Sequence, residues 1–174
     1  MFWAEAGRPC PVAKTVMSRA FVKEQDGSDV PEDIPERPVS EHPNFVTVRG
    51  LQLIEQRVRE LQAQRDAAKE EEDPSALARV DRELRYWLKR KSSAKLVEPE
   101  PEPRKVRFGV RTLVQYEDGK QQSYALVGED EADPANGLIS WMSPIAQSLL
   151  GCEVGDEPIL QGQRVGILRL EPIR

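Results

Sequence analysis

Apolar residues in the middle of the chain recur at the spacing of helices. From Thr47 onward they follow at steps of three and four, with Arg65 interrupting, and form one helical stripe: Leu51, Ile54, Val58, Leu61 and Ala68. After a break a second stripe follows, which consists of Leu77, Val80, Leu84 and Trp87 or Leu88. Two amphipathic helices joined by a short turn fold back on one another, so the sequence predicts an antiparallel coiled-coil hairpin over residues 45–97.

The break between the two stripes has the chemistry of a helix start. Asp73 can cap the second helix, and Pro74 suits its first turn because the missing N–H of proline would be unpaired there. A first helix of about 25 residues would be roughly 37 Å long at 1.5 Å per residue.

Short strand-like runs alternate with turns in residues 106–174. The runs are "VRFG", "VRTLVQY", "SYALVG", "GLISW" and "RVGILRLEPI", and Asp118-Gly119 forms a hairpin turn between two of them. Ser143 suits an N-cap, Pro144 the first helical position and Gly151 a stop, which predicts one short helix. Its Ile145, Leu149 and Leu150 can cover a face of the sheet. The predicted fold class is α+β, with a small antiparallel sheet behind the hairpin.

Two segments have the composition of connecting chain. Residues 1–44 combine repeated acids and prolines with little apolar periodicity, so we expect a disordered or loosely docked tail, with Phe21 and Phe45 as local anchors. Residues 98–105 alternate Glu and Pro, which predicts a stiff, extended linker between two domains.

Composition excludes several classes of function. The chain has 2 cysteines and 1 histidine, which leaves almost no material for a zinc site, a haem site or a Ser-His-Asp triad. The net charge of −5 argues against extensive coating of nucleic acid. Glu5 and Pro9 interrupt the place where a signal peptide is apolar, and no run is long enough for a membrane helix. We expect a soluble, cytoplasmic monomer with no cofactor of its own.

An ordered series of motifs resembles the C-terminal domain of the Gre family of bacterial transcription cleavage factors. In chain order it contains Val127-Gly128, Asp130-Glu131-Ala132-Asp133, Ile139-Ser140, Ser143-Pro144-Ile145-Ala146 and Gly151-Cys152-Glu153-Val154-Gly155-Asp156. "TVRGLQLI" also fits the Thr-x-x-Gly-x-x-x-Leu start of the family hairpin, with Ile54 in place of Leu. The resemblance implies an FKBP-like domain that grips the rim of the RNA polymerase secondary channel, with the hairpin inside that channel.

The Ser-Pro corner is the part that resembles a polymerase contact in this family. The candidate polymerase-binding residues are Met142, Ser143, Pro144 and Ile145. Met142 departs from the family, which has Asp or Asn at that position. The alternative is that Ser143 and Pro144 only begin a helix.

The predicted hairpin tip is acidic, with Glu70, Glu71, Glu72 and Asp73 in a row. In the family, two tip acids help to hold a Mg²⁺ ion shared with the polymerase active site, so Glu72 and Asp73 are the candidate metal ligands. The family tip motif Asp-x-x-Glu-Asn-x-Glu-Tyr is missing, however, and the hairpin is shorter than in cleavage factors. A solvated turn capped by Asp73, and a tip that modulates the active centre without cleavage, are the alternatives.

The second helix is rich in Arg and Lys, and this face could track transcript RNA or an acidic polymerase wall. The candidate contacts are Arg82, Arg85, Lys89 and Arg90. The alternative is a solvated face whose charges pair with acids of the first helix.

The sequence therefore predicts a transcription elongation regulator that binds bacterial RNA polymerase and is not an enzyme by itself. A second hypothesis is an FKBP-like interaction module that docks another partner. Prolyl isomerase activity is disfavoured, because the aromatic-lined pocket it needs is not evident among Phe108, Tyr116, Tyr124 and Trp141.

Overall fold

The computed structural model describes residues 35–173 of the 174-residue chain. Of the tail predicted over residues 1–44, only residues 35–44 fall in this range, and Phe21 lies outside it. Within the described residues, no helix combines the length and hydropathy needed to cross a membrane.

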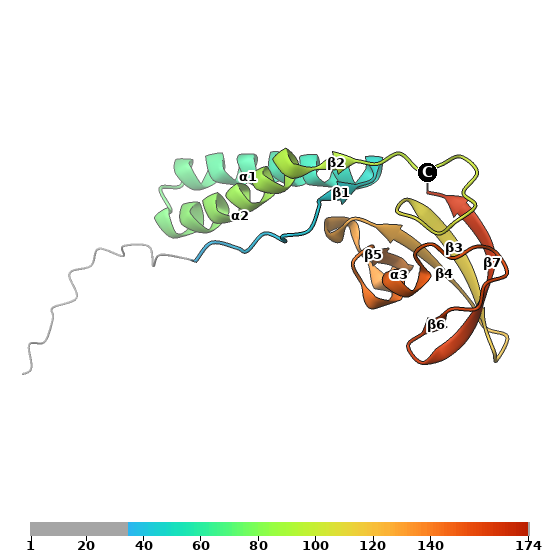
Figure 1. The fold of residues 1–174 in the computed structure, drawn as a ribbon. Coiled ribbons are helices and arrows are strands. Elements are labelled where there is room, and N and C mark those ends of the chain that lie inside the picture. Colours follow the sequence, from blue (N-terminus) through green and yellow to red (C-terminus); the bar gives the residue numbers. More distant parts are fainter. Residues whose placement is uncertain (1–34, 174) are drawn as a thin grey trace, which may run out of the picture. The chain divides into compact units, whose positions relative to one another are not determined.

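The middle of the chain folds into two antiparallel helices, α1 (Val48–Glu70) and α2 (Pro74–Ser93) (Figure 1). Thr47 caps α1, because its hydroxyl accepts a hydrogen bond of 2.9 Å from the N–H of Gly50. Asp73 caps α2 and Pro74 follows at the first position, as the sequence predicts. The predicted hairpin is confirmed.

The helices meet along the predicted stripes. Buried Val58 and Leu61 of α1 pack against Leu84 of α2, with Val80 and Trp87 at the edge of this cluster. Leu88 is 43% exposed, so the second stripe runs through Trp87. Apolar contact of this kind is the main stabilisation of a two-helix hairpin, because neither helix is stable alone.

Residues 110–172 form a five-stranded sheet of order β5-β4-β3-β7-β6. Its strands are β3 (Val110–Tyr116), β4 (Gln121–Val127), β5 (Leu138–Ser140), β6 (Ile159–Leu160) and β7 (Gln163–Pro172). All pairs are antiparallel except β4 and β5, which run parallel. The α+β layout is confirmed, and the parallel pair is a detail that the sequence does not reveal.

One predicted strand, "VRFG", is not a strand. Gly109 has a φ of +80°, so the chain turns there before β3 begins. The N–H of Val106 donates to the carbonyl of Cys152, and that of Gly109 donates to the carbonyl of Leu126. These bonds hold the turn against the domain without forming a ladder.

The short helix α3 (Pro144–Leu149) covers one face of the sheet (Figure 1). Its Ala146 and Leu149 are fully buried. They pack in a core with residues from several strands, among them Val114, Tyr124, Leu126, Ile139, Val165 and Ile167. Gly151, with a φ of +86°, ends the helix as predicted.

Four short elements flank the larger helices and strands. β1 (Phe45–Val46) and β2 (Lys95–Leu96) pair in parallel, with Phe45 opposite Lys95 and Val46 opposite Leu96. The 3₁₀ helix η1 (Glu129–Glu131) follows β4, and a second, η2 (Pro134–Asn136), precedes β5. The predicted linker, residues 98–105, contains no helix or strand, and its last residue, Lys105, forms an isolated bridge with Glu153.

Candidate functional site

The hairpin tip is a tight, exposed turn. Glu70 ends α1, Glu71 is its C-cap, and Glu72 adopts the left-handed conformation with a φ of +53°. The turn is closed by backbone bonds, since the N–H of Glu72 donates to the carbonyl of Lys69 and that of Asp73 to the carbonyl of Ala68. The side chains of Glu70 through Asp73 are all exposed.

Asp73 has a structural role at this tip. Its Oδ1 accepts hydrogen bonds of 2.9 Å from the N–H groups of both Ser75 and Ala76. Within residues 35–173, no three His, Cys, Asp or Glu side chains lie close enough together to hold a metal ion. The two hydrogen bonds support the capping alternative for Asp73.

The Ser-Pro corner borders an apolar cavity. Ser143 is the N-cap of α3, with its hydroxyl accepting from the N–H of Ala146, and Pro144 is exposed. Pro144 and Ile145 line a cavity of about 350 Å³ together with residues of η2, β5 and the β6–β7 turn, among them Pro134, Ile139 and Gln161. The corner is thus both a helix start and the edge of an apolar depression.

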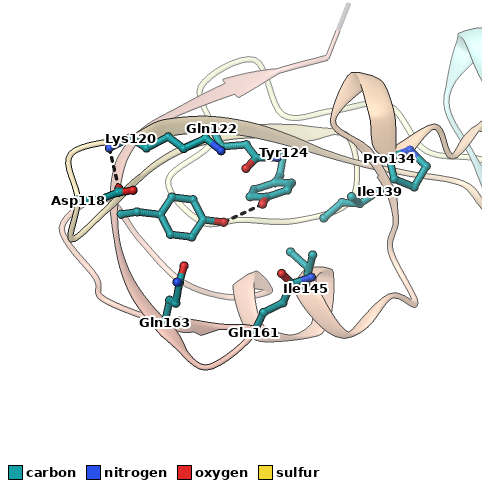
Figure 2. Close-up of a pocket in the computed structure, with 10 residues that line it drawn as sticks. Asp118, Lys120, Gln122, Tyr124, Pro134, Ile139, Ile145, Gln161 and Gln163 are labelled. Atoms are coloured by element: carbon teal, nitrogen blue, oxygen red, sulfur yellow. Dashed lines mark hydrogen bonds between the residues drawn. The ribbon is translucent and has the colours of Figure 1, made fainter.

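A second, more polar cavity of about 500 Å³ adjoins the first one and shares Pro134, Ile139, Ile145 and Gln161 with it. Figure 2 shows Asp118 and Lys120 at one end and Pro134 and Ile139 at the other. Among its lining residues are two tyrosines, Tyr116 and Tyr124, whose hydroxyls lie 2.8 Å apart.

Burial and the hydrogen bond to Tyr116 raise the pKa of Tyr124 far above its ordinary value. The hydroxyl of Tyr124 therefore stays protonated at neutral pH. One of the two hydroxyl hydrogens forms the bond between Tyr116 and Tyr124. The hydrogen of the other hydroxyl can therefore donate to an acceptor in the cavity. A carbonyl oxygen is the kind of acceptor that suits this position.

The other two aromatic candidates lie elsewhere. The rings of Phe108 and Trp141 contact Phe45, at centroid distances of 5.9 and 5.1 Å. Phe45 is thus an anchor, as expected, and it pairs with two residues of the C-terminal region. The cavity has two aromatic residues and several amides, which is not the apolar aromatic box that the sequence analysis sought.

The predicted basic face of α2 is only partly exposed, and some of its side chains are already paired with carboxylates. Arg85 is exposed and pairs with Glu36 at 2.6 Å, Arg82 pairs with the adjacent Glu83, and Lys89 is exposed. Arg90 is 1% exposed, so the prediction that it contacts nucleic acid or polymerase is wrong. In the last turn of α2 its guanidinium faces η1, where Nε lies 2.6 Å from Asp130 and Nη2 lies 3.2 Å from Glu129.

Sequence reasoning missed this acidic cluster of η1, defined here as Glu129, Asp130 and Glu131. Glu131 is 5% exposed and accepts a hydrogen bond from the hydroxyl of Thr47. The sequence identifies Asp130 and Glu131 only as part of a family motif, and Arg90 only as one of the basic residues of the second helix. Nothing in their spacing, 40 residues apart, predicted that they would meet.

Residues 100–165 match the family described as "Transcription elongation factor, GreA/GreB, C-term". This region, which is less than half of the chain, is similar to the C-terminal domain of the GreA and GreB factors. The resemblance noted in the motifs is confirmed, and the matched region contains the Ser-Pro corner, both cavities and the acidic cluster of η1.

Curated relatives of this chain are named as transcription elongation factors. It is 42% identical to transcription elongation factor GreB of Yersinia pestis over 86 residues, which are 49% of this chain and 50% of that protein. It is 40% identical to GreA of Geobacillus kaustophilus over 98 residues, 55% of this chain and 59% of that protein. The chain thus spans about half to three fifths of these relatives.

Among solved structures, GreA factor homolog 1 (Gfh1) of Thermus thermophilus is 20% identical, with a TM-score of 0.36. That match covers 75% of this chain and 99% of Gfh1.

Proposed function

We propose that this chain binds bacterial RNA polymerase through its C-terminal domain and regulates elongation by placing its hairpin tip in the secondary channel. The observation that carries the proposal is the GreA/GreB match over residues 100–165, together with relatives named transcription elongation factors. The helical hairpin that precedes this domain supplies an element for insertion.

The polymerase contact in this proposal is the Ser-Pro corner, Met142 to Ile145. Pro144 is exposed at the rim of the apolar cavity, and Ile145 forms part of its wall. An apolar side chain of the partner could be buried there, with the exposed proline as a rigid edge beside it. Ser143 supports the corner by capping α3.

The tip in this proposal modulates the polymerase and does not stimulate cleavage. Glu72 and Asp73 would face Mg²⁺ of the polymerase active centre, an ion that takes one or two carboxylates and keeps water and phosphate ligands. Oδ1 of Asp73 already accepts from two backbone N–H groups, so this oxygen is poorly placed to bind a metal ion. α1 has 23 residues, which is roughly 34 Å at 1.5 Å per residue. The chain itself is not an enzyme in this proposal.

The remaining basic residues of α2, namely Arg82, Arg85 and Lys89, are proposed to lie near transcript RNA or an acidic wall of the channel. Arg85 would have to exchange Glu36 for such a partner, and both side chains are about half exposed. An exposed ion pair of this kind is weak, so the exchange is energetically easy.

Binding is tested with purified core polymerase and the intact chain. We expect Pro144→Asp to weaken the complex about tenfold or more, because it places a charge at the edge of the apolar cavity. Val154→Asp is the matched control: Val154 is 57% exposed and does not line that cavity, so affinity should stay within about twofold. Absence of any complex with the wild-type chain would refute the proposal.

The choice between regulator and cleavage factor is tested with backtracked complexes and Mg²⁺. We expect a changed elongation or pausing rate without additional shortened transcripts. Shortened transcripts that disappear with Glu72→Ala plus Asp73→Ala would show instead that the tip supports cleavage. Asp73→Asn is the control, because asparagine keeps the cap and removes the charge.

The tyrosine-lined cavity gives some support to a second function, an FKBP-like module that binds a peptide of another partner. Its free hydroxyl hydrogen and its amides suit peptide groups. A peptide isomerisation assay separates the two functions. We expect no turnover, and measurable turnover lost in Tyr124→Phe would favour the module.

A further inference from the structure

Arg90 is the most deeply buried charged residue among the described residues, and it joins two regions that are far apart in sequence. Its side chain is 1% exposed, and its two nearest carboxylates belong to Asp130, 9% exposed, and Glu129, 26% exposed. Tyr86 of the same helix also donates to Asp130, at 3.3 Å. A buried arginine is tolerated only when such partners are held in place.

A second set of contacts joins the start of α1 to the same 3₁₀ helix. The hydroxyl of Thr47 donates to Glu131 and also accepts from the N–H of Gly50. A Cβ atom on Gly50 would lie 2.8 Å from Oε2 of the buried Glu131, so glycine allows this close approach. Both ends of the hairpin are therefore bound to three consecutive acids.

The segment before α1 also contacts Arg90 and the acidic cluster of η1. The hydroxyl of Ser40 donates to Glu129 at 2.9 Å, and the side-chain amide of Asn44 donates to the carbonyl of Arg90 at 2.7 Å. A Cβ atom on Gly128 would lie 2.6 Å from the carbonyl oxygen of Phe45, which shows how closely the two backbones approach. The contacts come from four separate segments and meet around Arg90 and η1.

The geometry points to Arg90 as a positioning residue that locks the hairpin to the C-terminal domain through the acidic cluster of η1. The lock holds the hairpin in one orientation relative to the domain. The guanidinium donates a directional hydrogen bond from Nε to Asp130 and forms an ion pair through Nη2 with Glu129, so it is held at two points and its rotation is restricted as well as its separation. The consequence for transcription rests on the function proposed above: a domain bound at the rim directs the tip only if the hairpin cannot swing.

A merely structural role would lower stability without changing orientation. The distinguishing measurement is a distance distribution between spin labels on the intact chain, with Cys10 and Cys152 replaced by serine. One label pair joins the tip to the domain, at Glu71→Cys and Val154→Cys. The other lies within the domain, at Glu117→Cys and Val154→Cys. All three labelled positions are exposed.

We expect Arg90→Met to broaden the tip-to-domain distribution at least about twofold and to leave the within-domain distribution unchanged. Arg85→Met is the matched control on the same helix, because Arg85 is 51% exposed and pairs only with Glu36 among the described ion pairs. It should leave both distributions unchanged. Arg90→Lys keeps the charge but lacks the planar guanidinium with its several N–H donors, so we expect a tip-to-domain distribution of intermediate width.

An unchanged tip-to-domain width in folded Arg90→Met protein would overturn the lock. If Arg90→Met fails to fold, Asp130→Asn gives the same test, since it removes the charge and keeps the shape. Loss of the fold in both variants would also refute the proposal, which requires a domain that folds without the lock.

Assays with core RNA polymerase separate this inference from the proposed function. Arg90→Met should bind core polymerase within about twofold of wild type and lose most of the hairpin-dependent effect on elongation. If the wild-type chain does not bind polymerase, the proposed function fails, while the distance measurement still decides the lock.

Discussion

Two runs of consecutive acids in this chain have opposite surroundings. Glu70 to Asp73 form the exposed hairpin tip, where the partners of Asp73 are the backbone N–H groups of the next helix. Glu129 to Glu131 form η1, where the partners are Arg90, Ser40 and Thr47, and where two of the three acids are nearly buried. A charge run in a sequence therefore does not reveal its role, because the role depends on what the fold places opposite it.

The comparison extends to two ion pairs with the same atoms and the same length. Nε of Arg65 lies 2.6 Å from Asp81 on the hairpin surface, and Nε of Arg90 lies 2.6 Å from Asp130 at the base. The first pair is 41% and 28% exposed and the second 1% and 9%. Water screens the first pair, whereas loss of one partner in the second leaves a buried charge.

The largest expected effect is that of Asp130→Ala. It leaves the guanidinium of Arg90 buried beside fewer acceptors, so we expect the free energy of unfolding to fall by about 3 to 5 kcal/mol. Asp81→Ala is the matched control and should lower the free energy of unfolding by less than about 1 kcal/mol. Urea denaturation measures both. Equal losses would show that burial does not distinguish the two pairs.

A smaller effect is expected at the tip, from Asp73→Ala. The substitution removes the acceptor for two N–H groups of α2 and should lower the free energy of unfolding by about 1 kcal/mol. Asp73→Asn should retain most of the wild-type free energy of unfolding, because asparagine caps helices about as well as aspartate. Thermal denaturation of the two variants tests this, and an equal loss in both would exclude capping as the cause.

The smallest effect has the opposite sign. Glu70 ends α1, where a negative charge opposes the helix dipole, so Glu70→Gln should stabilise by a few tenths of a kcal/mol at low salt. The gain should vanish in about 1 M salt, where the Debye length is roughly 3 Å. A gain that persists in high salt would mean that the dipole is not its source.

Most of the fold could be predicted from local patterns. Thr47, Asp73 and Ser143 cap helices where their types and spacings predict it, and the apolar stripe of α1 is buried at Ile54 and Val58. These features depend on neighbours three or four residues away, so sequence periodicity reveals them. The parallel pairing of β4 and β5 depends on a connection across two 3₁₀ helices, and no local pattern reports it.

The site was less predictable for the same reason. The Ser-Pro corner stands out because proline and serine have strong positional preferences, and it lies in the region that matches the GreA/GreB C-terminal family. Arg90 has the sequence character of its exposed neighbours Arg85 and Lys89, and only the packing of α2 against η1 makes it different. Identifying such a residue requires the tertiary contact itself.

The parallel pair β1 and β2 has a consequence for engineering. It sets Val46 opposite Leu96, so the chain enters and leaves the hairpin about one strand spacing apart, roughly 4.8 Å. Residues 47–95 therefore have the end geometry of a cassette that could replace a short surface loop of another protein. A host protein with two adjacent parallel strand ends could carry the helical hairpin without an added spacer.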